Sequence, residues 1–187
     1  MENLLYSDRL ETEKSFIKEV CDDILSRPIV DKEKSDLFAG IFVEGRNREI
    51  KTLEDLAAIH SFKAFSAFNY PIFCFIHNIN NFLLGEPKIW LDRYRIRVIE
   101  IPEINSLEEY SKFCIEKLYY LLPPEIENII TLQPDGMLLR SGWEEYVLDS
   151  QCDWLSPHWK HWAGIDVLWD DGEFGPVNFN LTCIGNG

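Results

Sequence analysis

The chain has 187 residues, of which 46% are hydrophobic and 13% aromatic, so it carries enough apolar surface for a packed core and is not a disordered chain. Its length favours a single domain over 1–187. The formal net charge of −14 argues against nucleic acid and anionic membranes as partners, because both are bound through clustered Lys and Arg.

The first fifty residues predict a helix followed by a strand. Apolar residues at helical spacing, among them Cys21 and Ile24, predict a helix over 8–26 that Pro28 terminates. The short apolar run 37–43 predicts a buried strand. The charged segment 44–48 is expected to turn the chain, as a hairpin leading to 49–51.

A second helix and two further strands are predicted next. Thr52 and Asp55 form a weak capping box for a helix over 52–68, and the run 72–76 is rich enough in β-branched and aromatic residues to predict a strand. A strand over 89–101 would place Arg93, Arg95 and Arg97 on one face. We expect these arginines to meet the chain's own surplus carboxylates, and the alternative is a phosphate-rich ligand or an acidic partner segment.

The third helix has the strongest local signals. Ser106 and Glu109 form a capping box, and Pro123 closes the helix. Its apolar face is predicted to consist of Leu107, Tyr110, Phe113, Cys114, Leu118 and Leu121.

The C-terminal third has frequent turn signals and short β-like runs, of which 163–169 and 177–184 are predicted to pair as strands. This part lacks the sustained alternation of strand and helix that a doubly wound sheet needs. We therefore predict an α+β fold, with a mainly antiparallel sheet, about three helices packed on one side, and a C-terminal third that is mostly β.

The cysteines indicate a reducing compartment. There are five and none forms a CxxC pair, which argues against a disulfide framework or a zinc ribbon. The N-terminal residues lack the pattern of a signal peptide, and the most apolar window, 70–76, is far shorter than the ~20 residues that cross a bilayer. We expect free thiols and a cytoplasmic protein without membrane attachment.

Common catalytic signatures are absent from the sequence, including a P-loop, GxGxxG, HExxH and GxSxG, which argues against the usual enzyme classes. The densest cluster of chemically active residues is 152–162. If Pro157 begins a short helix, His158 and His161 lie on one face and could share a divalent metal with Asp166, or with Asp170 or Asp171. The alternative is a tryptophan-rich connector whose histidines are half exposed.

Acidic residues are concentrated near the C-terminus. From Trp143 onward there are eight acidic residues and only one basic residue, Lys160, a net of −7. Aromatic residues lie among these acids, a combination that suits electrostatically steered binding. The predicted contact residues are Trp143, Glu144, Glu145, Asp153, Trp154, Trp159, Asp170, Asp171 and Glu173.

The favoured function is that of a small acidic binding or inhibitor-type protein, similar in overall character to immunity proteins, which neutralises a basic protein partner through this region. No cofactor is expected under this interpretation. A metal-dependent hydrolase that uses His158, His161 and a nearby Asp stays open, and so does a structural or assembly subunit whose aromatic residues fill a homo-oligomer interface.

Overall fold

The computed structural model describes residues 2–50, 52–81, 94–133 and 137–150, together with four short strands between 154 and 184. For residues 2–13, for residue 150 and for those four strands it describes the backbone alone. The chain forms two compact units, Met1–Ser141 and Gly142–Gly187. No helix among the described residues is both long enough and apolar enough to cross a membrane.

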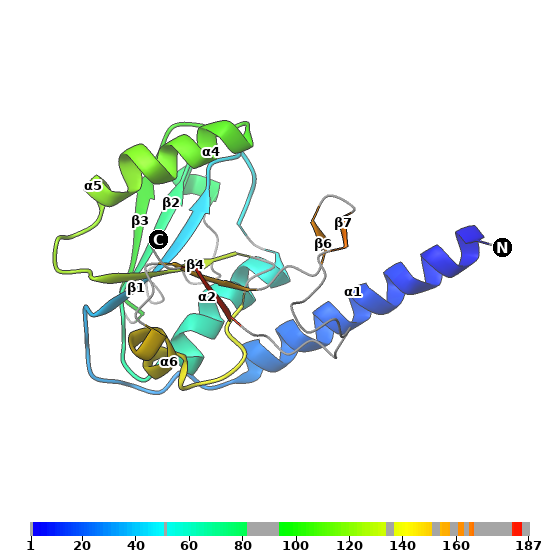
Figure 1. The fold of residues 1–187 in the computed structure, drawn as a ribbon, viewed down its shortest axis with the longest axis horizontal. Helices are drawn as coiled ribbons and strands as arrows, with labels where there is room; N and C mark the ends of the chain where they lie inside the picture. Colours follow the sequence, from blue (N-terminus) through cyan, green and yellow to red (C-terminus); the bar gives the residue numbers. More distant parts are fainter. Residues whose placement is uncertain are drawn as a thin grey trace. The chain divides into compact units, whose positions relative to one another are not determined.

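The first unit is built on a four-stranded sheet in which every neighbouring pair of strands is parallel (Figure 1). The strand order is β3-β2-β1-β4. The strands are β1 (Phe38–Glu44), β2 (Ile72–Ile76), β3 (Ile96–Glu100) and β4 (Asn128–Leu132). The prediction of a mainly antiparallel α+β sheet is therefore wrong, and this unit has an α/β fold.

The connection between β1 and β2 explains why these strands are parallel. The charged segment after β1 does not fold back as a hairpin but leads into a helix, α2 (Leu53–Phe65). A helical crossover returns the next strand in the same direction as the last. All five residues of β2 are buried, the pattern of a parallel strand covered on both faces, whereas a half-exposed antiparallel strand would alternate.

Helices cover both faces of the sheet (Figure 1). On one face, Ala39, Ile41, Phe73 and Phe75 pack against Phe113 and Leu118 of the third helical segment. On the other face, α2 approaches β1 so closely that a Cβ on Gly40 would lie 3.0 Å from the ring of Phe62. The first helix, α1 (Glu2–Ser26), packs on α2 through Cys21 and Ile24.

The predicted helix caps are confirmed. The hydroxyl of Thr52 accepts a hydrogen bond from the Asp55 amide, and the Asp55 carboxylate accepts one from the Thr52 amide. The hydroxyl of Ser106 accepts from the Glu109 amide at the start of α4 (Leu107–Phe113). The Glu109 carboxylate reaches back to the amide of Asn105 instead of that of Ser106.

The third helix contains a π-helical turn that changes its apolar face. After α4 the chain continues as η2 (Cys114–Leu118), which is π-helical, and as α5 (Tyr119–Leu121). A π turn contains more residues than an α turn, so each of its residues rotates less about the helix axis. The residues that follow it therefore point in a different direction than they would in a continuous α-helix. After the π turn, Leu122 packs against the core and Leu121 is exposed, which corrects the prediction for Leu121. Leu107, in the first turn of α4 and before the π turn, is also exposed, so the prediction for it is wrong as well.

The second unit begins with a helix, α6 (Trp143–Ser150), that the sequence did not predict. Two antiparallel pairs of strands follow, the first formed by β5 (Trp154–Pro157) with β8 (Leu181–Ile184). The second pair is β6 (His161–Trp162) with β7 (Ile165–Asp166). The predicted pairing of 163–169 with 177–184 is therefore not the one formed by the strands described.

The order of strands places a reversal in the middle of the sheet. From β1 the chain moves outward to β2 and β3, and then returns across the sheet to β4 on the other side of β1. In open α/β sheets, ligands bind beyond the carboxyl ends of the strands at such a point of reversal. The carboxyl ends of β1 and β4 are therefore the first place to search for a functional site.

Candidate functional site

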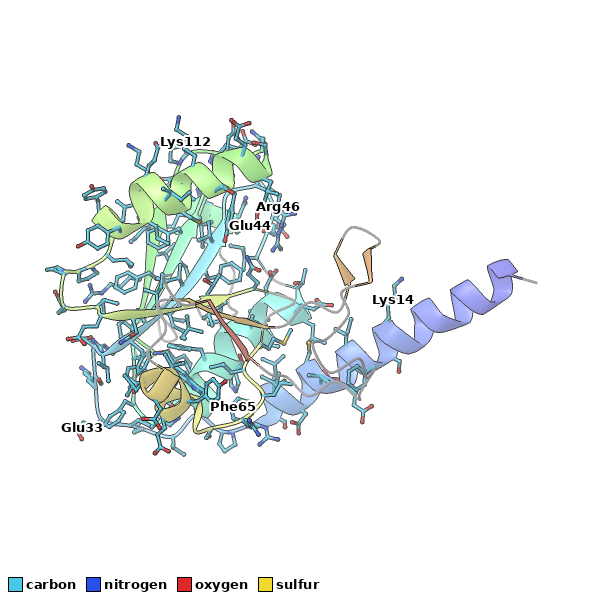
Figure 2. All side chains as sticks on the ribbon, in the orientation of Figure 1. Lys14, Glu33, Glu44, Arg46, Phe65 and Lys112 are labelled. Carbon is cyan, nitrogen blue, oxygen red and sulfur yellow. The ribbon has the colours of Figure 1, made fainter. Side chains whose placement is uncertain are left out.

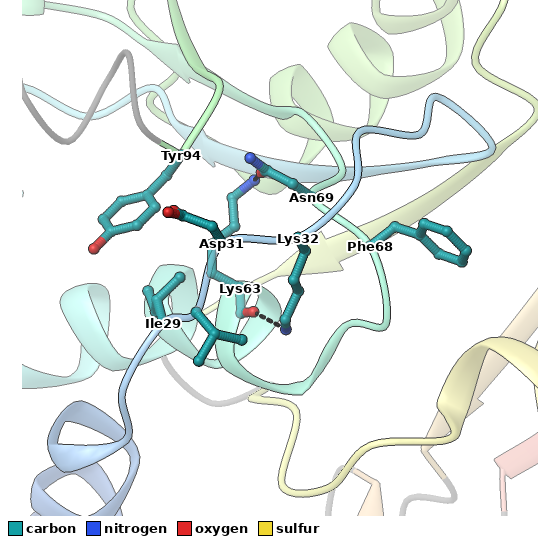
Figure 3. A pocket seen from close by; sticks show the side chains of 8 residues that line it. Ile29, Asp31, Lys32, Lys63, Phe68, Asn69 and Tyr94 are labelled. Atoms are coloured by element: carbon teal, nitrogen blue, oxygen red, sulfur yellow. Dashed lines mark hydrogen bonds between the residues drawn. The ribbon is translucent and has the colours of Figure 1, made fainter.

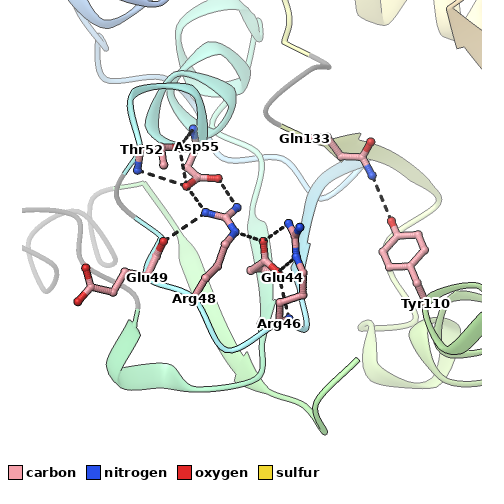
Figure 4. A network of polar contacts seen from close by, with 8 residues as sticks. All are labelled: Glu44, Arg46, Arg48, Glu49, Thr52, Asp55, Tyr110 and Gln133. Carbon is pink, nitrogen blue, oxygen red and sulfur yellow. Dashed lines mark hydrogen bonds and ion pairs between the residues drawn. The ribbon is translucent and has the colours of Figure 1, made fainter. Parts of the chain in front are cut away.

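A series of charged side chains, joined by hydrogen bonds, lies at the carboxyl end of β1 (Figure 4). The last residue of the strand, Glu44, is buried, and its carboxylate accepts hydrogen bonds from Nε and Nη2 of Arg46, both at 2.8 Å. The backbone amide of Arg46 donates to the same carboxylate at 3.0 Å. Glu44 also accepts a hydrogen bond from Nε of Arg48. One carboxylate thus holds two arginines.

Arg48 connects this carboxylate to a second one at the start of α2 (Figure 4). Its two Nη atoms donate to the two oxygens of Asp55, each at 2.7 Å, in a bidentate pair. Asp55 is fully buried and also accepts a hydrogen bond from the hydroxyl of Thr52 at 2.8 Å. The four charged residues Glu44, Arg46, Arg48 and Asp55 are called the carboxyl-edge network below.

The network keeps its carboxylates ionised. Burial by itself would raise the pKa of Glu44, but hydrogen bonds from Arg46 and Arg48 outweigh burial and hold the pKa below its ordinary value. The pKa of Asp55 is lowered in the same way, because the bonds from Arg48 and Thr52 exceed the effect of burial. The pKa of Arg48 is raised, chiefly by its hydrogen bond to Asp55.

Backbone contacts fix the loop that carries the network. The amide of His77, after β2, donates to the carbonyl oxygen of Glu44 at 3.0 Å, and the amide of Ile104, after β3, donates to that of Gly45 at 2.9 Å. A Cβ on Gly45 would lie 2.4 Å from Cβ of Ile104, so only glycine allows this close approach. The carboxyl ends of three strands are thereby tied together.

A separate polar pair lies at the end of β4. Nε2 of Gln133, the residue after the strand, donates to the hydroxyl of Tyr110 in α4 at 3.3 Å (Figure 4). Burial, with a further contribution from Cys114, raises the pKa of Tyr110 to about 12. The phenol therefore stays protonated at neutral pH.

Accessibility differs sharply within the network. The side chain of Arg46 is 69% exposed and that of Arg48 28%, while both carboxylates are buried. Arg46 is therefore the residue that a ligand from solvent would meet first (Figure 2). Within the parts of the chain that the structure describes, no group of three or more His, Cys, Asp or Glu is arranged to hold a metal ion.

A second cluster of charged residues lies near the opposite end of the strands. Nζ of Lys32 donates to the carbonyl oxygens of Lys63 and Ala64, at 2.8 and 3.2 Å, and to that of Ser66, all in the last turn of α2 or just after it (Figure 3). Nζ of Lys63, which is buried, donates to Oδ1 of Asn69 at 2.9 Å and to the carbonyl oxygen of Tyr70. A cavity of about 10 Å³ beside these residues has room for no more than a water-sized molecule.

Arg95 completes this second cluster. Its Nη1 donates to the carbonyl oxygens of Ser35 and Asn69, and its Nη2 pairs with the carboxylate of Asp36. The ion pair confirms the expected internal pairing for this arginine. Arg95 precedes β3 at a φ of +53°, so it is not part of a strand ladder with Arg97, whose guanidinium lies over the ring of Phe73. Arg93 falls in 82–93, which the structure does not describe.

Three of the predicted binding residues, Trp143, Glu144 and Glu145, lie in α6. Glu144 is 7% exposed, and contact of these three residues with a partner stays a prediction. Trp154 is placed in β5 by its backbone alone, and the remaining members fall outside the described residues: Asp153, Trp159, Asp170, Asp171 and Glu173. An acidic surface for a basic partner stays a prediction.

The predicted metal ligands are also described only in part. Pro157 is the last residue of the strand β5. It is therefore not the first residue of a helix, which the predicted metal site required. The backbone register pairs His161 with Asp166 across β6 and β7, while His158 lies in a segment without description. The thiols of Cys21, Cys74 and Cys114 are free, as expected, and those of Cys152 and Cys183 are not covered.

Sequence reasoning missed the carboxyl-edge network, although a signal for it was present. The residues 44–48 were interpreted as a turn, but they follow a fully apolar strand and precede a helix cap. Charged side chains at that position of an α/β unit lie at the edge where ligands bind. Comparison with known proteins adds no further guide, because no family description, curated protein or solved structure matches this chain.

Proposed function

We propose that the unit Met1–Ser141 binds a small ligand rich in hydrogen-bond acceptors at the carboxyl edge of its sheet, where β1 and β4 end. The observation that carries the proposal is the reversal of strand order at β1 in an all-parallel sheet. The position of the carboxyl-edge network at the end of β1 supports it, because the side chain of Arg46 is 69% exposed at this edge.

The accessible donors indicate the chemistry of the ligand. A guanidinium carries five N–H donors, and the two side-chain hydrogen bonds of Arg46 to Glu44 use two of them. The group is therefore held in a fixed orientation with donors to spare. Such a guanidinium suits the oxygens of a phosphate or a carboxylate, which it binds in a bidentate manner.

In many nucleotide-binding proteins the N-terminus of the helix after the first strand binds a phosphate. We do not expect this role for the corresponding helix here, α2. Its N-terminal amides already have the hydroxyl of Thr52 and the carboxylate of Asp55 beside them. A second anion would be repelled there by Asp55. We therefore expect the acceptor oxygens of the ligand on Arg46, and not on the N-terminus of α2.

The network favours binding over acid–base catalysis. A general acid or base works best when its pKa lies near the ambient pH, and the pKa values of both carboxylates are displaced downward, away from neutrality. Glu44 and Asp55 are thus suited to orient the arginines. Their proposed role is to preorganise the donor face of Arg46.

The test is a thermal-shift measurement with inorganic pyrophosphate, a nucleoside diphosphate and a dicarboxylate as probes. A ligand present at 100 times its Kd raises the free energy of unfolding by about 2.7 kcal/mol. Arg46→Ala should lose this response. Arg27→Ala is the matched control, because Arg27 is also exposed and also pairs with a nearby carboxylate, that of Asp23.

Two results would count against the proposal. One is an Arg46→Ala variant whose melting temperature rises with ligand as much as that of Arg27→Ala, which would place the ligand elsewhere. The other is a parent protein that responds to none of the phosphate-bearing or carboxylate-bearing probes.

A further inference from the structure

The helical segment 107–121 carries apolar side chains on two opposite faces. One face packs against the sheet through Phe113 and Leu118. The face turned away from the sheet exposes Leu107, Ile115 and Tyr119 by 80%, 79% and 79% of their surfaces. A helix that is apolar on both sides is normally covered on both, and exposed apolar patches of this kind mark interaction sites.

The exposed apolar residues form a row along the segment. Leu107, Ser111, Ile115 and Tyr119 recur at every fourth position, and all four are exposed. In an α-helix such a row drifts gradually around the axis, because a turn contains 3.6 residues. The wider turn of η2 rotates less per residue and offsets this drift, so the row stays on one side.

A charged row runs beside the apolar row. Glu108, Lys112 and Glu116 recur with the same spacing of four residues, one position later, and alternate in sign. All three are exposed, and Figure 2 shows Lys112 on the side of α4 away from the sheet. Among the described residues, no ion pair includes any of the three. Their charges are therefore available to a partner.

We propose that this face, 107–120, is the contact between two copies of the chain, packed as antiparallel helices about a two-fold axis. In such a contact a residue i that touches j is matched by j touching i. Leu107 of each copy then lies beside Tyr119 of the other, and Ser111 beside Ile115. Small Ser111 at the centre of the row lets the two helices approach closely.

The alternating charges select the antiparallel arrangement. When the apolar rows face each other in opposite directions, Lys112 of each copy lies near Glu116 of the other, and this ion pair forms twice. In a parallel arrangement about a two-fold axis the two charged rows would lie on opposite sides of the contact, so Lys112 and Glu116 would not meet and neither ion pair would form. The charged row is thus complementary to itself in one orientation only.

An anionic lipid surface fits this face less well. Helices that lie on membranes carry Lys and Arg on their polar side, whereas two of the three charges in this row are glutamates. The whole chain has a net charge of −14, which adds to the repulsion.

The test is sedimentation velocity of the full chain over a concentration series, with two charge reversals. The parent chain should form a dimer. Lys112→Glu and Glu116→Lys should each raise the dimer Kd by roughly tenfold or more, because each reversal places two like-charged pairs in the contact. An equimolar mixture of the two variants should form a mixed dimer, since both cross-pairs are then Glu with Lys.

The controls separate a specific contact from a general charge effect. Lys14→Glu changes an exposed lysine on α1 by the same charge and should leave the dimer intact. Ile115→Asp should dissociate the dimer without a change in the circular dichroism spectrum, because the side chain makes no core contact. A parent chain that stays monomeric, variants that associate like the parent, a mixture without mixed dimers, or binding to anionic vesicles in place of self-association would each overturn the proposal.

Discussion

The two ends of the parallel sheet both bury charged side chains, but they stabilise them by different means. At the carboxyl edge, the carboxylates of Glu44 and Asp55 face the guanidinium of Arg48, so each full charge meets an opposite full charge. At the opposite end Arg95 also pairs with a carboxylate, that of Asp36, but the ammonium groups of Lys32 and Lys63 face backbone carbonyl oxygens, which carry only partial charges.

This difference appears directly in the pKa values. The pKa values of Glu44 and Asp55 are lowered although burial acts to raise them, because the arginines outweigh burial. The pKa of Lys63 falls to about 7, because burial and the neighbouring Arg95 and Lys32 all disfavour its charged form. Full ion pairs therefore hold a buried charge in place, whereas carbonyl dipoles leave it close to titration at neutral pH.

The largest effect is expected from breaking the ion pair at the carboxyl edge. Asp55→Ala leaves Arg48 without its bidentate partner and removes the cap of α2, so the free energy of unfolding should fall by about 3–5 kcal/mol. Urea denaturation measures this change. The double variant Arg48→Met/Asp55→Leu should lose less than Asp55→Ala alone, because no unpaired charge remains buried. A double variant that is less stable than Asp55→Ala would show that the Arg48–Asp55 ion pair contributes more to stability than apolar side chains in its place.

A smaller effect is expected from Arg95 at the opposite end. Arg95→Ala removes the hydrogen bonds to Ser35, Asn69 and Asp36, and the free energy of unfolding should fall by about 2–3 kcal/mol. Because the backbone of Arg95 has a φ of +53°, Arg95→Gly should cost about 1 kcal/mol less than Arg95→Ala. Chemical denaturation of the two variants side by side gives the comparison. A glycine variant less stable than the alanine variant would mean that the left-handed conformation imposes no strain.

The smallest effect concerns the pH dependence that Lys63 imposes. Its folded pKa of about 7 lies below the ordinary 10.5, so between these values the unfolded chain binds a proton that the folded chain has released. The free energy of unfolding should therefore rise with pH, by about 1.4 kcal/mol per unit for one proton. Between about pH 7 and 8.5 the contribution of Lys63 to this gain is about 2 kcal/mol.

Lys63→Met isolates this contribution, since methionine fills the same space without a charge. The difference in slope between the parent and the variant, from denaturation curves at a series of pH values, should equal one proton. Identical slopes would show that the hydrogen bonds to Asn69 and Tyr70 keep Lys63 charged throughout this range.

Local elements were well predicted from the sequence. The end of α1 at Ser26, the strand cores of β1 and β2, and the caps at Thr52 and Ser106 all follow from interactions within a few residues. The apolar face of the third helix was predicted less well. A π turn is set by packing and not by a local motif, and it moved Leu121 out of the core and Leu122 into it.

The strand direction and the carboxyl-edge network were decided by the tertiary structure. Apolar runs such as 37–43 and 72–76 predict strands, but the same runs would suit either a parallel or an antiparallel neighbour. Glu44, Arg48 and Asp55 each have an ordinary local explanation, as a turn residue or a helix cap, and become a network only because β1 leads directly into α2. Short-range hydrogen bonds and periodicity are encoded locally and can be predicted from the sequence. Which strands become neighbours, and which charges meet at their ends, depends on long-range packing that no local pattern specifies.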